Sequence, residues 1–183
     1  MIPELIKKLE KAKTILYPTD TVWGLGCDAT NEKAVQKVYR LKNREESKSL
    51  IVLVDSIEML QNHVESIPAK VLTILQESKK PTTIIYKDPR DLAPNTIAAD
   101  NTIAIRIPKD DFCKDLIREF GKPIVSTSAN RSGEPTPKSF SEISPAVLDT
   151  VDYIVNLRQD EIASKSSTIL RVNEHDEIEV LRE

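Results

Sequence analysis

The stretch Thr102–Thr127, TIAIRIPKDDFCKDLIREFGKPIVST, contains the strand–helix–strand pattern that decides the fold. Alternating isoleucines over residues 102–107 predict a strand, and residues 124–127 predict a second one. Between them, residues 110–120 predict a helix, because acidic side chains occupy its start and Gly121 follows its end. Strands that alternate with helices in this way are typical of an α/β domain.

The same alternation extends through most of the chain. It predicts helices over residues 3–13, 31–42, 57–63, 69–78 and 139–148, and strands over residues 14–17, 49–54, 82–86, 151–156, 168–172 and 178–182. Because helices stop after residue 148, the sheet is predicted to be parallel in part and antiparallel toward the C-terminus. Since no repeat or linker interrupts the pattern, we expect residues 1–183 to form one α/β domain, a twisted mixed sheet flanked by helices.

Composition restricts the class of protein. The 183 residues include 26 Lys+Arg and 29 Asp+Glu, and 39% are hydrophobic, which excludes wholesale disorder. The longest aliphatic run, Leu50–Val54, is far shorter than the roughly 20 residues that span a bilayer, and the N-terminus lacks an apolar signal segment. Cys27 and Cys113 form no disulfide framework or metal-ligand pattern. We therefore expect a cytoplasmic protein with no membrane contact and no protein-bound metal.

Two loops that follow predicted strands hold three of the four glycines. They are PTDTVWGLGCDA (residues 18–29) and SANRSGEPTP (residues 128–137). Around them cluster hydroxyl, amide and carboxylate groups, which suit a polar ligand such as an amino acid or a nucleotide. These residues are Thr19, Asp20, Thr21, Ser126, Thr127, Ser128, Asn130 and Ser132. We expect such a ligand at the carboxyl ends of the strands, although ordinary turn chemistry explains either loop alone.

Cations provide the second signal. Six lie within residues 33–48, and Lys42 and Arg44 are two residues apart just beyond a predicted helix. In an extended segment they would face the same way and clamp a polyphosphate; the alternative is a solvated helix end. Arg106 interrupts an aliphatic run, on the face opposite the isoleucines and shared with Ala104 and Thr102. There it would meet either a ligand carboxylate in a cleft or solvent.

The sequence lacks the motifs of several common catalytic and phosphate-binding sites. The two histidines, His63 and His175, form no metal or dyad pattern, and neither a nucleophile elbow nor a phosphate-binding P-loop is present. The segment Gly24-x-Gly26-x-x-Ala29 formally matches the dinucleotide fingerprint, with Asp55 ending the next predicted strand. Six residues separate Gly24 from the preceding strand, whereas the true fingerprint opens almost directly from it. A nucleotide-dependent redox enzyme is therefore a minor alternative.

Five segments carry a resemblance to a known family. In order along the chain they are YPTDTVWGLGCDA, VYRLKNREESKSLIVLV, TIAIRIP, VSTSANRSGEPTP and SSTI. Together they resemble the YrdC-type L-threonylcarbamoyladenylate synthase family in its short form, over about residues 14–182. The K-x-R pair, Lys42 and Arg44, with the S-x-N pair, Ser128 and Asn130, matches the family signature.

The resemblance implies an α/β domain with an open, positively lined cleft. It implies formation of threonylcarbamoyl-AMP and pyrophosphate from L-threonine, bicarbonate and ATP, with Mg²⁺ carried in by the nucleotide. A downstream tRNA threonylcarbamoyl-transferase complex would use the product to make N6-threonylcarbamoyladenosine at position 37 of tRNA. The alternative is a YrdC-like paralogue that binds RNA or nucleotides without synthase activity, which the basic stretch over residues 33–48 motivates.

The family's functional positions can be placed on this sequence. Those that would bind threonine are Thr21, Arg106, Ser126 and Ser167. Those that would bind ATP are Arg44, Lys48, Thr102, Ser128, Asn130, Thr136 and Arg182, although Arg182 lacks the glycine that usually follows it. Lys42 and Arg44 would be catalytic, by aligning and neutralising the phosphates. A neutral amine is already a good nucleophile, so this chemistry needs no Ser-His or Cys-His dyad.

Overall fold

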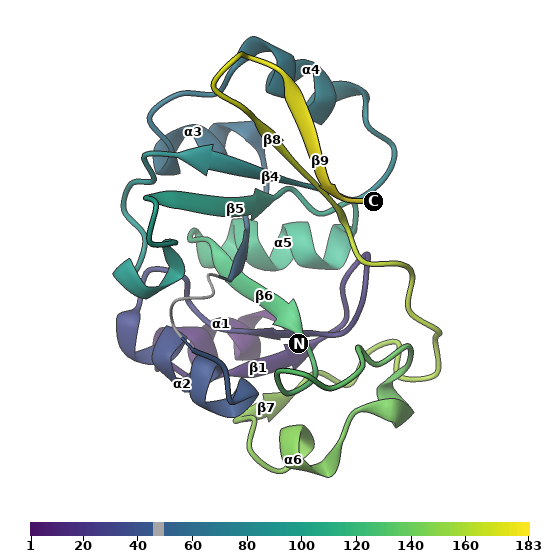
Figure 1. Cartoon of the computed structure of the whole chain (residues 1–183). Helices are drawn as coiled ribbons and strands as arrows, with labels where there is room; N and C mark the ends of the chain where they lie inside the picture. The colour runs from purple at the N-terminus through teal and green to yellow at the C-terminus, as the bar shows by residue number, and fades with distance from the viewer. Residues whose placement is uncertain (46–49) are drawn as a thin grey trace.

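The computed structural model describes residues 1–45 and 50–183 (Figure 1). Its helices are α1 (Ile2–Glu10), α2 (Glu32–Lys42), α3 (Ile57–His63), α4 (Ala69–Glu77), α5 (Asp111–Phe120) and α6 (Pro145–Leu148), with 3₁₀ turns η1 (Pro94–Thr96) and η2 (Phe140–Glu142). Side chains cap three of the helices at their N-termini: Asn31 accepts from Ala34 N, Ser56 from Met59 N, and Asp110 from Cys113 N. No helix in these two ranges has the length and apolar character needed to cross a membrane.

The described strands form one nine-stranded sheet with the order β7-β1-β2-β6-β3-β5-β4-β8-β9. They are β1 (Ile15–Tyr17), β2 (Gly24–Gly26), β3 (Ile51–Leu53), β4 (Thr82–Lys87), β5 (Thr102–Arg106), β6 (Ile124–Ser128), β7 (Tyr153–Ile154), β8 (Thr168–Val172) and β9 (Ile178–Arg182). The prediction of a mixed sheet flanked by helices is confirmed. Parallel pairs join β1 to β7, β3 to β5 and β4 to β8, and the other neighbours are antiparallel.

The prediction that the sheet becomes antiparallel toward the C-terminus is confirmed only for the last pair of strands. Strand β8 pairs with β4 in parallel, and β7 pairs with β1 in parallel, so only the β8–β9 hairpin is antiparallel there. Both parallel partners are far away in sequence. Such long-range pairing depends on how the whole chain packs, which local patterns do not show.

Two other segments differ from the prediction. The expected helix over residues 139–148 splits into η2 and the short helix α6, and the expected strand over residues 151–156 shrinks to the two residues of β7. Pro145 separates the two turns, because it lacks an N–H and so can sit only in the first turn of a helix.

The expected loop over residues 18–29 contains a central strand, β2, between β1 and β6. Its glycines serve close packing. A Cβ added at Gly26 would collide with the Val125 carbonyl oxygen and lie 2.7 Å from Tyr17 Cε1. Sequence patterns indicate a turn wherever glycines cluster, so this strand was missed.

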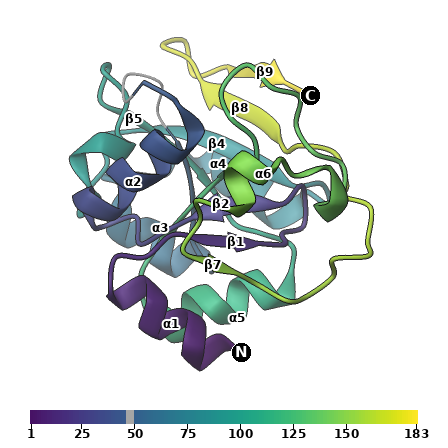
Figure 2. The ribbon, with the colours of Figure 1, turned by 90° about the horizontal axis from the view of Figure 1, so that it is seen from below.

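Helices cover both faces of the sheet (Figures 1 and 2). Helices α1 and α5 lie side by side and bury one face, where they pack on Tyr17, Leu53 and Ile124. Helices α2, α3 and α4 pack on the opposite face, against alternate strand residues such as Val52 and Ile105. Helix α6 packs on the face of β1 and β2 that is opposite to α1 and α5, against Leu16 and Leu25.

Candidate functional site

The sheet face that α1 and α5 cover at one end is left open at the other. On β6, Ile124 packs under α5, and two residues further along, Ser126 lines a cavity. The neighbouring strand β3 is arranged in the same way. Its Leu53 pairs with Ile124 and packs under the helix, whereas its Ile51 pairs with Ser126 and lines the cavity. Alternate strand residues share a face, so one face has a packed part and an open part.

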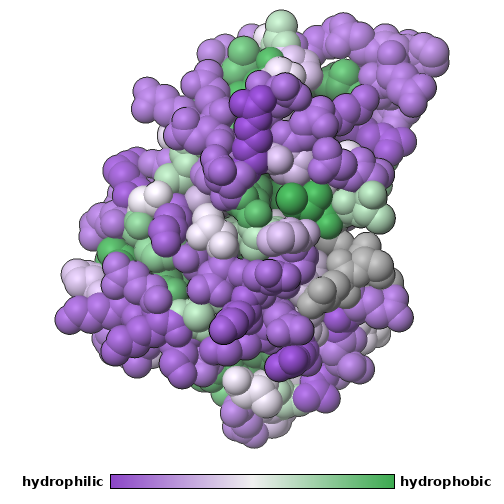
Figure 3. All heavy atoms as spheres, turned by 90° about the vertical axis from the view of Figure 1, so that its left-hand side faces the viewer, coloured by the Kyte–Doolittle hydropathy of each residue, from purple (hydrophilic) through white to green (hydrophobic). Residues whose placement is uncertain are grey.

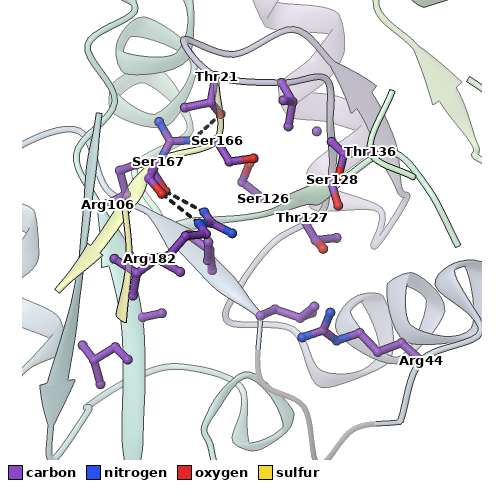
Figure 4. Close-up of a pocket in the computed structure, with 17 residues that line it drawn as sticks. Thr21, Arg44, Arg106, Ser126, Thr127, Ser128, Thr136, Ser166, Ser167 and Arg182 are labelled. Carbon is purple, nitrogen blue, oxygen red and sulfur yellow. Dashed lines mark hydrogen bonds between the residues drawn. The ribbon is translucent and has the colours of Figure 1, made fainter. Parts of the chain in front are cut away.

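The open part is a cavity of about 320 Å³, within the range of small-molecule sites. Seven strands and four connecting segments contribute to it. Its lining is Thr21, Val22, Gly24, Arg44, Leu50, Ile51, Ile85, Ala104, Arg106, Ser126, Thr127, Ser128, Thr136, Ser166, Ser167, Ile169 and Arg182. Figure 4 shows the polar members converging from opposite sides. Figure 3 shows hydrophobic side chains at the surface near the middle of one face, with hydrophilic residues above and below them.

The lining carries positive charge. Arg44, Arg106 and Arg182 belong to it, and no Asp or Glu among the described residues does. The pKa of Arg182 is lowered by burial and, in addition, by the charge of Arg106. Two guanidinium groups that disfavour each other in a partly enclosed space favour the binding of an anion between them.

One end of the cavity is buried. Thr21, Arg106, Ser126 and Ser167 are between 3% and 7% exposed there. The guanidinium of Arg106 forms an ion pair with Asp20, and its Nη2 donates to Thr21 Oγ1 at 3.4 Å. These four are the positions that the family resemblance assigns to threonine.

The other end is open to solvent. Arg44 and Ser128 are half-buried there and Thr136 is exposed, and all three lie apart from Arg106 in the cavity (Figure 4). They are positions that the resemblance assigns to ATP. One groove therefore has an enclosed, hydroxyl-rich end and an open, cationic end.

Arg182 lies between the two ends (Figure 4). Its Nε donates to the Ser167 carbonyl oxygen at 3.0 Å and its Nη2 to Ser167 Oγ at 3.3 Å. The Ser167 hydroxyl is also 2.7 Å from Thr83 Oγ1. The antiparallel β8–β9 hairpin thus brings Arg182 to the cavity without the glycine that usually follows this arginine.

Lys42 does not line the cavity. The prediction that it faces the same way as Arg44 in an extended segment is wrong. Helix α2 continues to Lys42, and Asn43 caps it in the left-handed region at φ 50°, so Lys42 and Arg44 do not lie in one extended segment. Instead, Lys42 Nζ donates to the Ser128 carbonyl oxygen at 2.6 Å and to the Asn130 carbonyl oxygen at 2.8 Å. Burial, and then the charge of Arg44, lowers the pKa of Lys42 to about 8.

Three further predicted nucleotide contacts lie outside the cavity or outside the described residues. Asn130 is buried and its amide donates to the Glu134 carbonyl oxygen at 2.7 Å, so it shapes the loop that follows β6. Thr102 shares the face of Ala104 but lines an adjacent hollow, where its hydroxyl donates to Asp100. Lys48 lies outside the described residues.

The Gly24–Ala29 segment does not have the strand-to-helix turn that a dinucleotide fingerprint requires. Gly24 and Gly26 lie within β2 rather than at a strand-to-helix turn, and Asp55 forms an ion pair with Arg118 at 3.5 Å, away from the cavity. The candidate cavity is lined by residues along the strands and not only by residues beyond their carboxyl ends, and the expected ligand position stays a prediction.

Sequence reasoning missed most of the apolar floor and one hydroxyl of the cavity. The floor is formed by Leu50, Ile51, Ile85, Ala104 and Ile169, and the hydroxyl is that of Ser166. The alternation in residues 102–107 did place Ala104 on the same face as Arg106. The other floor residues come from strands whose neighbours are remote in sequence, so only the sheet order brings them together.

Comparison with known proteins gives a consistent result. The Sua5/YciO/YrdC family model, whose description is "Telomere recombination", matches residues 7–183. A protein named threonylcarbamoyl-AMP synthase from Xanthomonas axonopodis pv. citri (strain 306) is 34% identical over 155 residues, 82% of each chain.

Solved structures have the same fold. The structure of P. abyssi Sua5 complexed with L-threonine matches 99% of this chain with a TM-score of 0.88 and 25% identity. This chain covers 53% of that one, so it spans about half its length. The structure of E. coli YciO matches 100% of this chain and 88% of its own, with a TM-score of 0.86, and its 21% identity shows the fold alone.

Proposed function

Since the chain belongs to the Sua5/YciO/YrdC family, we propose that it is a threonylcarbamoyl-AMP synthase, which joins L-threonine, bicarbonate and ATP into threonylcarbamoyl-AMP and releases pyrophosphate. The relatives that share about a third of its residues carry the name of this activity, and the P. abyssi structure binds the amino acid.

One observation carries the proposal. A single cavity joins a buried, hydroxyl-rich end around Arg106 to an open end around Arg44, with Arg182 between them. An amino acid fits the buried end, because Arg106 can hold its carboxylate and Thr21, Ser126 and Ser167 can bond its polar groups. A triphosphate fits the cationic end, where Arg44 and Ser128 would contact it together with Thr136.

The groove would act by alignment. The neutral amine of threonine attacks the carbon of carbon dioxide, or of bicarbonate with loss of hydroxide, and forms a carbamate after losing a proton. A carbamate oxygen then attacks the α-phosphorus of ATP, and the bond to the β-phosphate oxygen breaks to release pyrophosphate. Holding the two reactants in one cavity supplies proximity, and the Arg44 and Arg182 cations stabilise negative charge on the phosphates.

Lys42 has a supporting role in this proposal. Its ammonium group spans two carbonyl oxygens of the segment that carries Ser128, so it would hold that segment against the nucleotide. This assigns Lys42 a positioning role, whereas Arg44 keeps the role of a direct phosphate contact.

Magnesium would arrive with the nucleotide. Within residues 1–45 and 50–183, no group of three or more His, Cys, Asp or Glu side chains gathers to hold a metal ion, and the cavity lining there has no carboxylate. Mg²⁺ commonly binds through substrate phosphates and water, so the triphosphate can bring it without a protein cage.

The product would feed a tRNA threonylcarbamoyl-transferase complex. A mixed anhydride of a carbamic acid and AMP is a reactive acyl donor, so a second enzyme must consume it soon after release. Direct RNA binding by the basic residues between 33 and 48 stays a prediction, and steep salt dependence of RNA affinity would be its signature. The comparisons favour the synthase over a binding module.

A pyrophosphate-release assay tests the function. The protein is incubated with MgATP, L-threonine and bicarbonate, and pyrophosphate is measured against reactions that lack threonine or bicarbonate. We expect release only in the complete mixture, together with a product of the mass of threonylcarbamoyl-AMP. If folded protein releases no more pyrophosphate than the threonine-free control, the proposed function is wrong.

A further inference from the structure

A chain of hydrogen bonds that starts at Thr19 fixes whether the Thr21 hydroxyl donates or accepts toward a ligand. Thr19 Oγ1 lies 2.7 Å from the Val22 carbonyl oxygen, 3.0 Å from Thr21 Oγ1 and 3.0 Å from the Thr21 backbone N. A carbonyl oxygen only accepts, so the single hydroxyl proton of Thr19 goes to Val22. The Thr19 oxygen then accepts from both the Thr21 N–H and the Thr21 hydroxyl, which uses its full bonding capacity.

It follows that the Thr21 hydroxyl proton is also committed. Thr21 must donate to Thr19, and it accepts from Arg106 Nη2 at 3.4 Å. One lone pair of Thr21 Oγ1 is left, on a side chain that lines the cavity and is only 6% exposed. Toward a ligand, therefore, Thr21 can accept a hydrogen bond and cannot donate one.

The neighbouring Arg106 shows which part of the ligand lies there. Its Nη1 is taken by Asp20, whereas its buried Nε has no hydrogen-bond partner among the described residues. The side chain is 3% exposed and lines the same cavity, so the Nε side of the guanidinium is ready for a carboxylate. In an α-amino acid the donor nearest the carboxylate is the amino group, one carbon away.

We propose that Thr19 is a positioning residue for amino-acid binding: it orients the Thr21 hydroxyl so that Thr21 accepts a hydrogen bond from the substrate amino group, while Arg106 holds the carboxylate. The inference rests on the proposed function, since it names how that site recognises its amino acid. Because Thr19 is not in the cavity lining, it acts only through Thr21.

The test compares Thr19→Val, which keeps the shape and removes the hydroxyl, with Thr19→Ser, which keeps the hydroxyl. We expect Thr19→Val to raise the Kd for L-threonine roughly 5- to 10-fold, the effect of one lost hydrogen bond, and to leave the KM for ATP unchanged. Thr19→Ser should restore the wild-type Kd. Equal Kd values for wild type and a folded Thr19→Val protein would overturn the proposal.

Two analogues separate the amino group from the side-chain hydroxyl. L-2-Aminobutanoate keeps the amino group, so Thr19→Val should raise its Kd by the same factor as the Kd for L-threonine. 3-Hydroxybutanoate lacks the amino group, so its inhibition constant should not change. A loss confined to ligands with the β-hydroxyl would overturn the proposal.

The remaining outcomes are also decisive. If Thr19→Val does not fold, wild-type binding decides: 2-aminobutanoate must bind more tightly than 3-hydroxybutanoate, and the reverse order refutes the assignment. Failure of the proposed function looks different, because the wild type would then release no pyrophosphate with any amino acid.

Discussion

The arginines of the groove differ because their neighbours differ. Arg106 is buried and already paired with Asp20, so its remaining donors serve orientation more than net charge. Arg182 donates twice to Ser167 and feels the charge of Arg106, which together with burial lowers its pKa. Arg44 lies at the open end, where a highly charged phosphate group can enter.

Replacement of Arg44 by alanine tests the cationic end. We expect Arg44→Ala to lose about 2–5 kcal/mol of transition-state stabilisation if the contact with the phosphates is desolvated, seen as a fall in kcat/KM for ATP. The measurement is pyrophosphate release at varied ATP. Lys33→Ala, which removes an exposed cation from the preceding helix α2, is the matched control and should keep the wild-type rate. An unchanged rate for Arg44→Ala removes this residue from the site.

The lowered pKa of Lys42 predicts that the free energy of unfolding depends on pH. Burial, with the charge of Arg44, lowers its pKa to about 8 in the folded protein, against 10.5 for a free lysine. Between these values the unfolded chain binds one more proton than the folded one, so the Lys42 contribution makes the free energy of unfolding rise with pH. Below pH 8 both states are protonated and the cost of burying the charge is complete.

Urea unfolding at several pH values measures this effect. Relative to Lys42→Met, wild-type stability should rise between about pH 8 and 10.5, by at most about 3 kcal/mol. Lys33→Met, an exposed lysine on α2, should follow the wild-type profile. Parallel profiles for wild type and Lys42→Met would show that the buried amine does not titrate in this window.

At the scale of elements, β2 shows how packing overrides local propensity. A strand with two glycines in three residues has little intrinsic strand preference. It forms because β1 and β6 lie on either side of it, and because Tyr17 and the Val125 backbone leave no space for a side chain at Gly26.

The substitution Gly26→Ala tests this packing. The added methyl would collide with the Val125 carbonyl oxygen, so we expect a loss of roughly 3 kcal/mol or more in the free energy of unfolding. Gly121→Ala is the comparison, because its Cβ would meet nothing within 4 Å and its cost, about 1 kcal/mol, comes from its positive φ of 76° alone. Equal losses for the two variants in urea unfolding would contradict the packing explanation.

Element predictions succeeded where the pattern is local. Helix 57–63 is confirmed as α3 to the residue, and the isoleucine alternation in β5 correctly placed Ile103 and Ile105 on one face and Ala104 and Arg106 on the other, where they line the cavity. They failed for β2 and for the helix expected over residues 139–148. The glycines of β2 serve contacts with the rest of the fold, and Pro145 starts a new helix within a segment whose apolar pattern is continuous.

For the whole molecule, ligand binding should raise thermal stability. ATP bound only by the folded state at 100 times its Kd adds about 2.7 kcal/mol. We therefore expect MgATP to raise Tm in a concentration-dependent way, and L-threonine to raise it further because both occupy one cavity. NAD at the same concentration should leave Tm unchanged, since the Gly24 motif is strand β2. A Tm shift with NAD and none with MgATP would support the alternative of a dinucleotide-binding redox enzyme.

The sequence by itself determined the α/β class, the family and most of the polar residues of the groove, because these depend on local periodicity and on short motifs. Only the tertiary structure showed that Arg44, Arg106 and Arg182, from remote segments, line one cavity, and that Lys42 binds backbone carbonyls beside it. The order of the strands and the left-handed cap at Asn43 decided both. Each arises from packing between distant parts of the chain, which no local pattern encodes.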